Sequence, residues 1–402
     1  MYIPQSLIKR DVYIDRIRPF MRKNIAKVLT GQRRVGKSFI LYQLMRQIAV
    51  DDPKANIIYV NLEDFTHYNL RTATDLNDYI TSQLQPSTYN YIFIDEIQEV
   101  PEFERVVRSL LLNPSNDIYI TGSNANMLSS ELSTYLSGRY VEFTVHSLSY
   151  VEFLSFHNLD DSDESLHRYT RYGGLPYLVN LQLTDGVVDE YLKSVYSTIV
   201  YRDVVGRYNL RNSDLLERLL RFLADNIGNL FSSKSISDYL KAQKTAISVV
   251  QIKSYTNYLA SSYLINAIER YDLVGKRIFD FGEKYYFENL GLRNVVAGYR
   301  TADDAKLLEN LVYNHLVYRQ YRVCTGQLGS VEIDFIAERD DEKLYIQVAL
   351  RIDSEATAQR EYGNLLKIAD NYPKYIITAD PHSGSSYNGI RHLTIRQFLL
   401  NF

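Results

Sequence analysis

Residues 25–45 read IAKVLTGQRRVGKSFILYQLM and contain the pattern G-x-x-x-x-G-K-S between Gly31 and Ser38. An apolar run typical of a β-strand precedes the pattern, and an apolar helical periodicity follows it. In this context glycines let consecutive backbone N–H groups point at phosphate oxygens, and the helix N-terminus adds a partial positive charge. The stretch therefore predicts a phosphate-binding loop between a strand and a helix, and with it an α/β fold.

The side chains of this loop predict how ATP and Mg²⁺ bind. Lys37 is placed to reach the β- and γ-phosphates, and the Ser38 hydroxyl is placed to coordinate the metal ion. Arg33 and Arg34 have three open roles, which are contact with phosphate, contact with a neighbouring subunit, and exposure to solvent. The predicted ATP contacts in this stretch are Gly31, Gln32, Arg33, Arg34, Val35, Gly36, Lys37, Ser38 and Phe39.

Strand-like and helix-like segments alternate through the first 165 residues. The apolar strand candidates are residues 25–30, 57–61, 91–95, 118–121 and 141–145, and the helix candidates are 37–50, 73–84 and 102–112. Such alternation predicts a parallel sheet that is covered by helices on both faces. We therefore expect residues 1–165 to form a P-loop ATPase domain of the α/β class.

Two carboxylates, Asp95 and Glu96, end the apolar run that begins at Tyr91. The carboxyl ends of parallel strands line the ligand crevice of such a sheet, so Asp95 is placed to hold Mg²⁺ through water. Glu96 is then placed to act as the general base that takes a proton from the attacking water. The alternative is a strand that merely ends in two solvated acids.

Polar residues also stand at two further strand boundaries. Ser123 and Asn124 follow the strand candidate at 118–121, and Asn124 is the residue we expect to bond the γ-phosphate or the water, unless this is a simple polar turn. Arg139 precedes the candidate at 141–145, and an arginine there can stabilise charge on the transferring phosphoryl group. Action in cis suits a monomer, action in trans requires a dimer or ring, and a solvated loop arginine is the plain alternative.

The composition gives a nearly neutral protein whose charge is unevenly distributed. The 402 residues include 45 basic and 48 acidic side chains, a net charge of −3, which argues against a general coat of basic charge for nucleic acid. Residues 166–300 nevertheless have a basic excess, which leaves open that this part faces an anion. A single cysteine, Cys324, and the lack of a long apolar run or a secretory segment predict a cytoplasmic protein without a membrane partner.

The region after residue 165 changes character from mixed to mainly helical. We expect a helical lid at 166–230, followed by a winged-helix domain at 231–300. The latter is expected because four consecutive segments read helix, helix, strand and strand, namely 235–240, 248–260, 263–270 and 276–287.

The second helix of the predicted winged helix is the one that would enter the major groove of duplex DNA. It offers Gln251, Lys253, Ser254 and Asn257, a modest set of groups for reading bases. Winged helices also serve as protein-contact modules, so double-stranded DNA and a protein partner both remain open.

The final hundred residues, 301–402, follow an α-β-β-β-α-β order that resembles the restriction-endonuclease fold, with Glu309 and Asp334 at the positions of two metal-binding acids. In active members of that fold the next strand carries E-x-K. Here Gln347 and Ala349 occupy those two positions, so a charged metal ligand and an ammonium are missing. We therefore predict a nuclease-like domain that does not cleave.

The motifs GQRRVGKS, YIFIDEIQEV, YITGSNANML and LSGRY together resemble the signatures of prokaryotic AAA-type ATPases. The resemblance is to the branch in which a P-loop domain precedes an uncharacterised C-terminal region, and it continues through residues 172–179, 199–208 and 271–294. It implies ATP binding and slow hydrolysis coupled to conformational change. It also implies that Gly174 and Pro176 start the lid, with Pro176 near the nucleotide base as in signal-transduction (STAND) ATPases; otherwise GGLP is only a helix-breaking turn.

Three functions follow from the sequence. The first is an ATPase whose C-terminal domains report the nucleotide state to a partner. The second is a DNA-binding protein that is gated by ATP, and the third, which the loss of E-x-K disfavours, is a metal-dependent nuclease.

Overall fold

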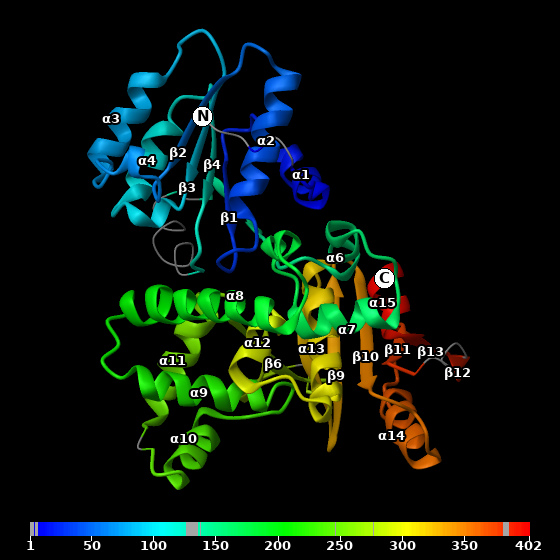
Figure 1. Cartoon of the computed structure of the whole chain (residues 1–402). Helices are drawn as coiled ribbons and strands as arrows, with labels where there is room; N and C mark the ends of the chain where they lie inside the picture. Colours follow the sequence, from blue (N-terminus) through cyan, green and yellow to red (C-terminus); the bar gives the residue numbers. More distant parts are fainter. Residues whose placement is uncertain are drawn as a thin grey trace. The chain divides into compact units, whose positions relative to one another are not determined.

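The computed structural model describes the chain apart from residues 1–3, 5–6, 126–135, 137, 246, 276 and 381–385, and apart from the side chains of residues 277–281. The described residues divide into two compact units. The first unit holds Met1–His146 together with Ser261–Tyr263, and the second holds Ser147–Ala260 together with Leu264–Phe402. Figure 1 labels their helices and strands. Within the described part of the chain, no helix is long and apolar enough to cross a membrane.

The first unit is built around a sheet of five strands that all run parallel. In spatial order they are β2 (Asn56–Asn61), β3 (Asn90–Asp95), β4 (Asn116–Thr121), β1 (Ala26–Thr30) and β5 (Tyr140–Thr144). Parallel neighbours cannot be joined by a hairpin, so helices cross over between them. These helices include α2 (Lys37–Asp51), α3 (Ala73–Gln83) and α4 (Phe103–Leu110). The predicted α/β fold, with the parallel sheet typical of P-loop nucleoside triphosphatases, is confirmed.

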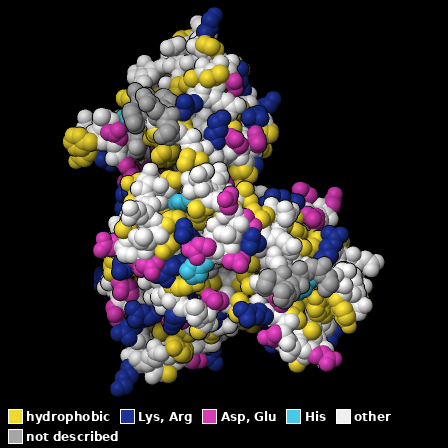
Figure 2. All heavy atoms as spheres, turned by 45° about the vertical axis from the view of Figure 1, so that its right-hand side comes forward, with side chains coloured by type: hydrophobic (Ala, Val, Ile, Leu, Met, Phe, Trp, Pro, Cys, Tyr) yellow, Lys and Arg dark blue, Asp and Glu magenta, His cyan; other side chains and the backbone are white. Residues whose placement is uncertain are grey.

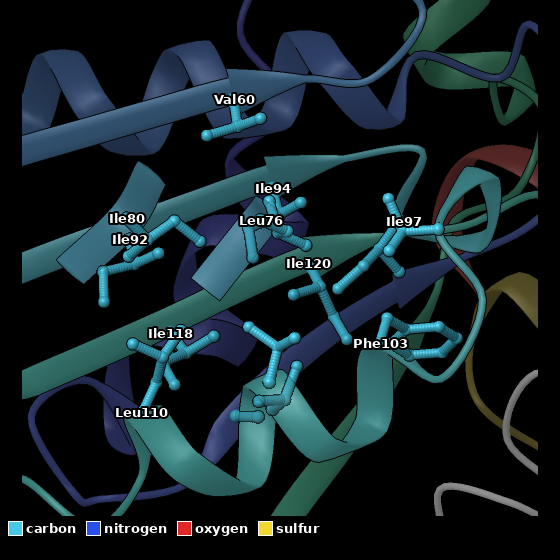
Figure 3. Close-up of a cluster of buried hydrophobic side chains, with 14 of the residues drawn as sticks. Val60, Leu76, Ile80, Ile92, Ile94, Ile97, Phe103, Leu110, Ile118 and Ile120 are labelled. Atoms are coloured by element: carbon cyan, nitrogen blue, oxygen red, sulfur yellow. The ribbon is translucent and has the colours of Figure 1, made fainter. Parts of the chain in front are cut away.

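One face of this sheet packs against α3 and α4 through aliphatic side chains (Figure 3). Alternate residues of each strand point to this face, such as Ile94 of β3 and Ile120 of β4, both fully buried. They meet Ile80 of α3 and Phe103 and Leu110 of α4. Because each buried side chain of this size contributes roughly 1.5–3 kcal/mol, this layer fixes the strand order on which the site depends.

A buried ion pair lies within the sheet on the opposite face, the one that α2 covers. It joins Lys27 of β1 to Asp117 of β4, and both side chains are almost completely buried. The Asp117 carboxylate also accepts a hydrogen bond from the Tyr119 hydroxyl at 2.6 Å, and the Lys27 ammonium lies 4.3 Å from the centre of the Tyr119 ring. Burial lowers the pKa of Lys27. The pair links two neighbouring strands whose carboxyl ends both enter the candidate site.

The second unit begins with a series of helices. They are α6 (Tyr150–His157), α7 (Asp163–Tyr172), the 3₁₀ turn η5 (Pro176–Asn180), α8 (Asp185–Ser197), the π-helical segment η6 (Thr198–Gly206), α9 (Ser213–Asp225), α10 (Ser233–Ala242), α11 (Val249–Ser261) and α12 (Leu290–Ala297). Arg293 of α12 is completely buried and pairs with Asp303 at 2.7 Å. Its Nε also donates to the carbonyl oxygen of Ala224 at 2.8 Å, which fastens α12 to the end of α9.

A mixed eight-stranded sheet completes the second unit. In spatial order its strands are β12 (Ser386–Tyr387), β13 (Ile390–Thr394), β11 (Lys374–Thr378), β10 (Glu342–Ala349), β9 (Val331–Arg339), β8 (Arg322–Leu328), β6 (Ile265–Asp272) and β7 (Arg277–Phe287). The helices that accompany it are α13 (Asp304–Tyr318), α14 (Glu355–Leu366) and α15 (Ile395–Asn401).

Strands β6 and β7, which the sequence predicts as the wing of a winged helix, are part of this sheet. β6 pairs with β7 in the antiparallel sense and also with β8 in the parallel sense, with Arg270 opposite Thr325. The predicted helix–helix–strand–strand order is present, but its hairpin continues into the C-terminal sheet. The finer boundaries at residues 231 and 301 therefore stay predictions. The short strands β12 and β13 have no counterpart in the sequence-based expectation.

Candidate nucleotide site

Three motifs meet at the carboxyl edge of the first sheet. Strand β4 pairs with both β1 and β3, so the carboxyl ends of these three strands lie side by side. The phosphate motif follows β1, Asp95 and Glu96 stand at the end of β3, and Thr121 ends β4. Ligands of open parallel sheets bind outside such strand ends, where the connections diverge. The fold thus assembles the predicted motifs into one candidate site.

The two glycines of the motif hold backbone conformations that side chains rarely adopt. Gly31 has φ +136°, and a Cβ added there would lie 2.1 Å from the carbonyl oxygen of Val145. Gly36 has φ +96° and precedes α2, whose start has no side-chain cap. A phosphate can therefore serve as the acceptor for the first-turn N–H groups of α2.

Lys37 is the first residue of α2, and its side chain is buried against the loop. Its ammonium donates to the carbonyl oxygens of Gly31 and Gln32 at 3.0 and 3.1 Å. Charge-assisted bonds to phosphate are roughly twice as strong as bonds between neutral groups. The ammonium is thus held at the loop by acceptors that a phosphate ligand can replace.

An arginine far upstream supports the same loop. Arg10, which precedes α1 (Asp11–Ile17), is buried, and its Nη1 donates to the carbonyl oxygens of Val35 and His146, each at 3.0 Å. Its backbone N–H donates to Oε1 of Gln43 on α2 at 3.0 Å. Our sequence analysis did not single out Arg10, because a lone arginine in a terminal segment carries no motif.

Asp95 is buried at the end of β3 and receives two hydroxyl donors. Thr121 Oγ1 donates to its Oδ1 at 2.5 Å, and the Tyr59 hydroxyl donates to its Oδ2 at 3.1 Å. The Ser38 hydroxyl lowers the pKa of Asp95 as well, so the two predicted metal ligands lie near each other. Burial raises the pKa of Asp95 and the Glu96 carboxylate adds to the rise, whereas the hydroxyl donors lower this pKa.

Glu96 adopts a left-handed conformation with φ +55°, which is uncommon for a residue other than glycine. Its backbone N–H donates to Thr121 Oγ1 at 2.9 Å, so one threonine hydroxyl holds both Glu96 and Asp95. Its Oε2 accepts from Nε2 of Gln98 at 2.5 Å, and the same Nε2 lies 3.4 Å from the hydroxyl of Ser123. Gln98, from the 3₁₀ turn η3 (Ile97–Glu99), therefore sets the direction of the Glu96 carboxylate.

The other predicted loop contacts have different surroundings. Gln32 is completely buried, and Arg33 pairs with Glu63 at 3.1 Å. Arg34 is exposed, and Phe39 is 53% exposed. Arg33 is thus tied to its own unit, while Arg34 faces solvent.

Asn124 lies at the carboxyl ends of the strands, and Arg139 lies at their amino ends. Asn124 is buried just beyond the end of β4, on the edge that carries the phosphate loop. Arg139 is exposed and precedes β5, and its carbonyl oxygen accepts from the N–H of Ala26 at the start of β1. A full strand length therefore separates Arg139 from Gly31, because β1 and β5 run parallel. The fold does not bring Arg139 to the phosphate loop of its own chain.

Gly174 and Pro176 belong to the second unit, where Pro176 begins η5. A Cβ on Gly174 would lie 2.5 Å from the carbonyl oxygen of Leu148, so the backbone approaches closely at this point. The expected position of Pro176 near the nucleotide base stays a prediction.

Three residues that position the predicted acids were missed by our sequence reasoning, namely Thr121, Tyr59 and Gln98. Thr121 had a usable signal, because it ends the strand directly before the polar residues that drew attention. Tyr59 had a weaker one, since alternation along β2 turns it toward the same face as Asp95 along β3. Gln98 lies within the short turn η3, and only the folded chain shows its bond to Glu96.

The oxygen donors at the strand edge fit a magnesium ion. Mg²⁺ prefers hard oxygen ligands and is usually bound by one or two protein groups together with substrate phosphates. Ser38 and Asp95 supply a hydroxyl and a carboxylate that lie near each other. These two residues would hold the ion.

The second unit contains a different cluster of acids, and it modifies the nuclease argument. Lys284 of β7 lies 2.9 Å from both Glu309 and Glu332 and 3.8 Å from Asp334. The lysine that is absent at Ala349 is thus matched by one from a strand assigned to the wing. Its ammonium, however, lies among the carboxylates themselves, and among the described residues no group of three or more acids, histidines or cysteines is arranged to bind a metal.

Gln347, the other replaced position, also belongs to this cluster. Its Oε1 lies 3.4 Å from the backbone nitrogen of Asp334. Burial raises the pKa of Asp334, and the nearby Glu309 carboxylate raises it further, while Lys284 acts in the opposite direction. That residues 301–402 do not cleave nucleic acid stays a prediction. Its reason is now that the Lys284 ammonium lies among the carboxylates that would bind the metal.

Comparison with known proteins agrees with the fold and defines the family. A family profile for the AAA domain matches residues 23–154, and a profile for a domain of unknown function (DUF8612) matches residues 163–303. The first of these spans the sheet and the site described above, so the chain contains an AAA-type P-loop domain.

Two relatives match along most of their length. An uncharacterised protein of Haemophilus influenzae is 35% identical over 98% of this chain and 99% of its own length. An uncharacterised protein of Methanocaldococcus jannaschii is 30% identical over 89% of this chain and 80% of its own length. The chain belongs to the same family as these two proteins.

Solved structures with a similar arrangement include the Aeropyrum pernix ORC1 protein in complex with DNA and AMPPCP-bound DnaA from Aquifex aeolicus. The first has a TM-score of 0.34 and 12% identity, and covers 73% of this chain and 94% of its own. The second has a TM-score of 0.34 and 11% identity, and the match covers 65% of this chain and 93% of the DnaA chain. At this level of similarity they add nothing to the functional argument.

Proposed function

We propose that this chain is an ATPase that binds Mg-ATP at the carboxyl edge of its first sheet and passes the nucleotide state to its second unit. One observation carries the proposal. Thr121 Oγ1 bonds both the Asp95 carboxylate and the Glu96 N–H, immediately beside the phosphate loop. A metal-holding acid and an adjacent base at the phosphate loop are the parts that hydrolysis of a γ-phosphate requires.

Binding of the triphosphate uses groups that are already in place. The Lys37 ammonium exchanges the carbonyl oxygens of Gly31 and Gln32 for phosphate oxygens. The first-turn N–H groups of α2 donate to the same phosphates. Arg10 keeps the loop from shifting, because it bonds the carbonyl oxygen of Val35 within the loop. The loop is therefore pre-organised for an anion.

Hydrolysis falls to the two acids and their supports. Glu96 accepts a proton from the water whose oxygen attacks the γ-phosphorus, and ADP departs with the electron pair of the broken P–O bond. Gln98 directs the Glu96 carboxylate, and Asn124 donates to the γ-phosphate. When bound between Ser38 and Asp95, Mg²⁺ supplies neutralising charge for the phosphates.

Two substitutions test this proposal. Lys37→Ala is expected to abolish detectable ATP binding in titration calorimetry. Glu96→Gln is expected to bind Mg-ATP with near wild-type affinity but to lower hydrolysis by about 10²–10⁴, the usual contribution of a general base. If wild-type protein binds no nucleotide, or if Glu96→Gln hydrolyses ATP at the wild-type rate, the proposed mechanism is wrong.

The position of Arg139 supports a role in trans, at the site of a neighbouring subunit. Mixing two inactive variants distinguishes this from a role in cis. Lys37→Ala lacks its own site but retains Arg139, whereas Arg139→Ala has the reverse defect. An equimolar mixture is expected to regain hydrolysis if Arg139 acts in trans. A mixture as inactive as its two components, in a preparation shown to be oligomeric, would contradict this role.

Duplex DNA is the second candidate partner, and the exposure of one helix face favours it. Gln251, Lys253 and Asn257 of α11 are exposed. Figure 2 shows basic and acidic side chains interspersed over the face in view, which agrees with the near-zero net charge.

An electrophoretic assay across salt concentrations tests this second candidate. We expect retardation at low salt that weakens as salt rises, and Lys253→Gln should reduce the salt slope by about one unit. Lys193→Gln, on α8 of the same unit, is the matched control. Absence of retardation at the lowest salt concentration would leave a protein partner as the remaining alternative.

A further inference from the structure

Three residues of the chain leave the second unit and join the first. Ser261–Tyr263 belongs to the first unit, whereas Ala260 before it and Leu264 after it belong to the second. In the sequence this segment connects the end of α11 to the start of β6. A segment this short is therefore covalently tied to two elements of one unit while its contacts lie in the other.

The tip of the segment contacts the nucleotide site at two points. Nε2 of Gln32, inside the phosphate loop, donates to the carbonyl oxygen of Tyr263 at 2.8 Å. The N–H of Ala125, directly after Asn124, donates to the carbonyl oxygen of Ser261 at 2.9 Å. The segment thus joins the loop that would bind the phosphates to the end of β4.

A third contact reaches the last strand of the same sheet. The Tyr263 hydroxyl lies 3.3 Å from Oε1 of Glu142 on β5. The same oxygen accepts from Thr30 Oγ1 at 2.7 Å, at the end of β1 and next to Gly31. The segment therefore links the ends of β1 and β4 with β5, the three strands next to the phosphate loop.

The base of the segment is closed in the second unit. The N–H of Leu264 donates to the carbonyl oxygen of Leu259 at 3.1 Å, which joins the last turn of α11 to the entry of β6. Ile265 is then paired with Phe287 in the β6–β7 ladder. The tip is therefore a short loop whose two ends are joined by a hydrogen bond.

Two local features indicate that this arrangement is maintained at a cost in stability. Tyr263 has φ +57°, a left-handed conformation that costs on the order of 1 kcal/mol for a residue with a side chain. Gln32 is fully buried, and its Oε1 has no hydrogen-bond partner among the residues that the structure describes. The Gln32 side chain is therefore held for the single bond that its Nε2 donates to Tyr263.

We propose that Ser261–Tyr263 is a positioning segment of the nucleotide site, through which occupation of the phosphate loop changes α11 and β6. The inference rests on the ATP-binding function proposed above. When phosphates draw the loop around them, Gln32 moves with the loop and pulls the Tyr263 carbonyl. The short segment transmits this displacement to the closed base, and hence to the helix proposed to contact DNA or a protein partner.

Hydrogen–deuterium exchange read by mass spectrometry tests this coupling in the full chain. The Glu96→Gln background keeps ATP bound during labelling. We expect Mg-ATP to change exchange in residues 249–260 and 264–272, as well as at the phosphate loop. Gln32→Met keeps the length of the side chain but removes its donor, and because Gln32 belongs to the phosphate loop it is labelled at an ATP concentration that calorimetry shows to saturate it. It should then lose the change in both distal peptides while the loop still shows the nucleotide effect.

Two further variants make the result specific. Gln83→Met is the same substitution at an exposed position in the last turn of α3, and it should retain the full distal response. Tyr263→Gly keeps the carbonyl that accepts from Gln32 but loosens the segment, so it should bind ATP and lose the distal response. Titration calorimetry on every variant establishes that the nucleotide is bound.

The outcomes separate the two proposals. If calorimetry detects no ATP binding to the wild type, the proposed function fails and this inference fails with it. If ATP binds but residues 249–260 and 264–272 do not change, or change equally in Gln32→Met and Tyr263→Gly, the inference is overturned while the ATPase proposal stands.

Discussion

The two units each bury a lysine at the site of the predicted acids, yet the printed partners of these lysines differ in charge. In the first unit Lys37 bonds to loop carbonyls, and the Asp95 carboxylate is held by hydroxyl groups. In the second unit the Lys284 ammonium lies directly among Glu309, Glu332 and Asp334. In the first arrangement a charged ligand can displace the loop carbonyls from the lysine, whereas in the second the lysine is paired with acids of its own unit.

This difference explains why similar residues support different roles. Replacing carbonyl partners of an ammonium by phosphate pairs the ammonium with a negative charge, so a ligand stabilises the first cluster. A metal ion entering the second cluster would have to displace a cation that three carboxylates already neutralise. We therefore regard the first as a binding site and the second as a structural ion cluster between β7, β9 and α13.

The largest expected effect comes from exchanging each lysine for methionine. Lys284→Met should lower the stability of the protein by about 3–5 kcal/mol, because it leaves buried carboxylates without their cation. Lys37→Met should lower stability by less than Lys284→Met, because the Gly31 and Gln32 carbonyls that lose their donor carry no net charge. Scanning calorimetry measures the stability of both, and titration calorimetry measures ATP binding.

The two substitutions should also differ in ATP binding, in the opposite order from their effects on stability. Lys284→Met should still bind Mg-ATP at temperatures where it is folded, whereas Lys37→Met should not. If Lys284→Met were as stable as the wild type, the second cluster would not be a structural ion cluster.

A second expected effect concerns acid sensitivity, which we assign to the second unit. Burial lowers the pKa of His315 on α13 to about 4, with the Arg319 charge adding to the effect. The unfolded chain therefore binds more protons than the folded chain between about pH 6.5 and pH 4, so stability falls as the pH falls through this window. The loss should reach about 2–3 kcal/mol near pH 4.

His315→Phe removes this proton-binding group while keeping a ring beside Phe398, whose centre lies 5.0 Å away. Its stability should vary less between pH 6.5 and pH 4.5 than that of the wild type, as measured by urea unfolding at each pH. An unchanged pH dependence would show that acid sensitivity has another origin.

A smaller effect is expected from the threonine that holds both acids of the first unit. Thr121→Val removes the donor to Asp95 and the acceptor for the Glu96 N–H, and should cost about 1–3 kcal/mol of stability. It should also lower kcat about tenfold or more, because the base is no longer held in place. Steady-state hydrolysis assays measure the change in kcat separately from KM.

Thr378→Val provides the matched control in the second unit, because Thr378 is also a buried threonine, at the end of β11, 2.9 Å from the His392 ring. It should reduce stability without changing kcat. Equal losses of kcat in both variants would mean that Thr121 acts through general stability only.

The smallest expected effect is that of Tyr59→Phe. The substitution removes the weaker of two hydroxyl donors to Asp95, at 3.1 Å, and should cost about 0.5–1.5 kcal/mol of stability. Because Thr121 and Ser38 remain, ATP hydrolysis should fall less than in Thr121→Val. A larger loss than in Thr121→Val would reverse the order of importance that the distances indicate.

Much of the first unit was predictable because its signals are local. The expected strand at 25–30 is observed as Ala26–Thr30, and the expected helix at 37–50 is observed as Lys37–Asp51. Strand polarity alone also separates Asn124, which follows a parallel strand, from Arg139, which precedes one. That argument was available from the sequence, and it disfavours a role for Arg139 in cis.

The bonds that complete the site were not predictable, because they join residues far apart in the chain. Gln32 and Tyr263 are separated by 231 positions, and no periodicity relates them. Lys284 reaches Glu309 only because β7 joins the C-terminal sheet, which a search along one strand for E-x-K cannot reveal.

The sequence by itself determined which chemistry this protein carries. A glycine loop followed by lysine and serine, and two acids at the end of an apolar strand, specify a phosphate and metal site through local backbone geometry and residue type. Only the tertiary structure decided how these groups are held and connected. The bond from Thr121 to both acids, the place of Lys284 and the contacts of Ser261–Tyr263 depend on strand order and side-chain packing, which are set by the burial of the whole chain.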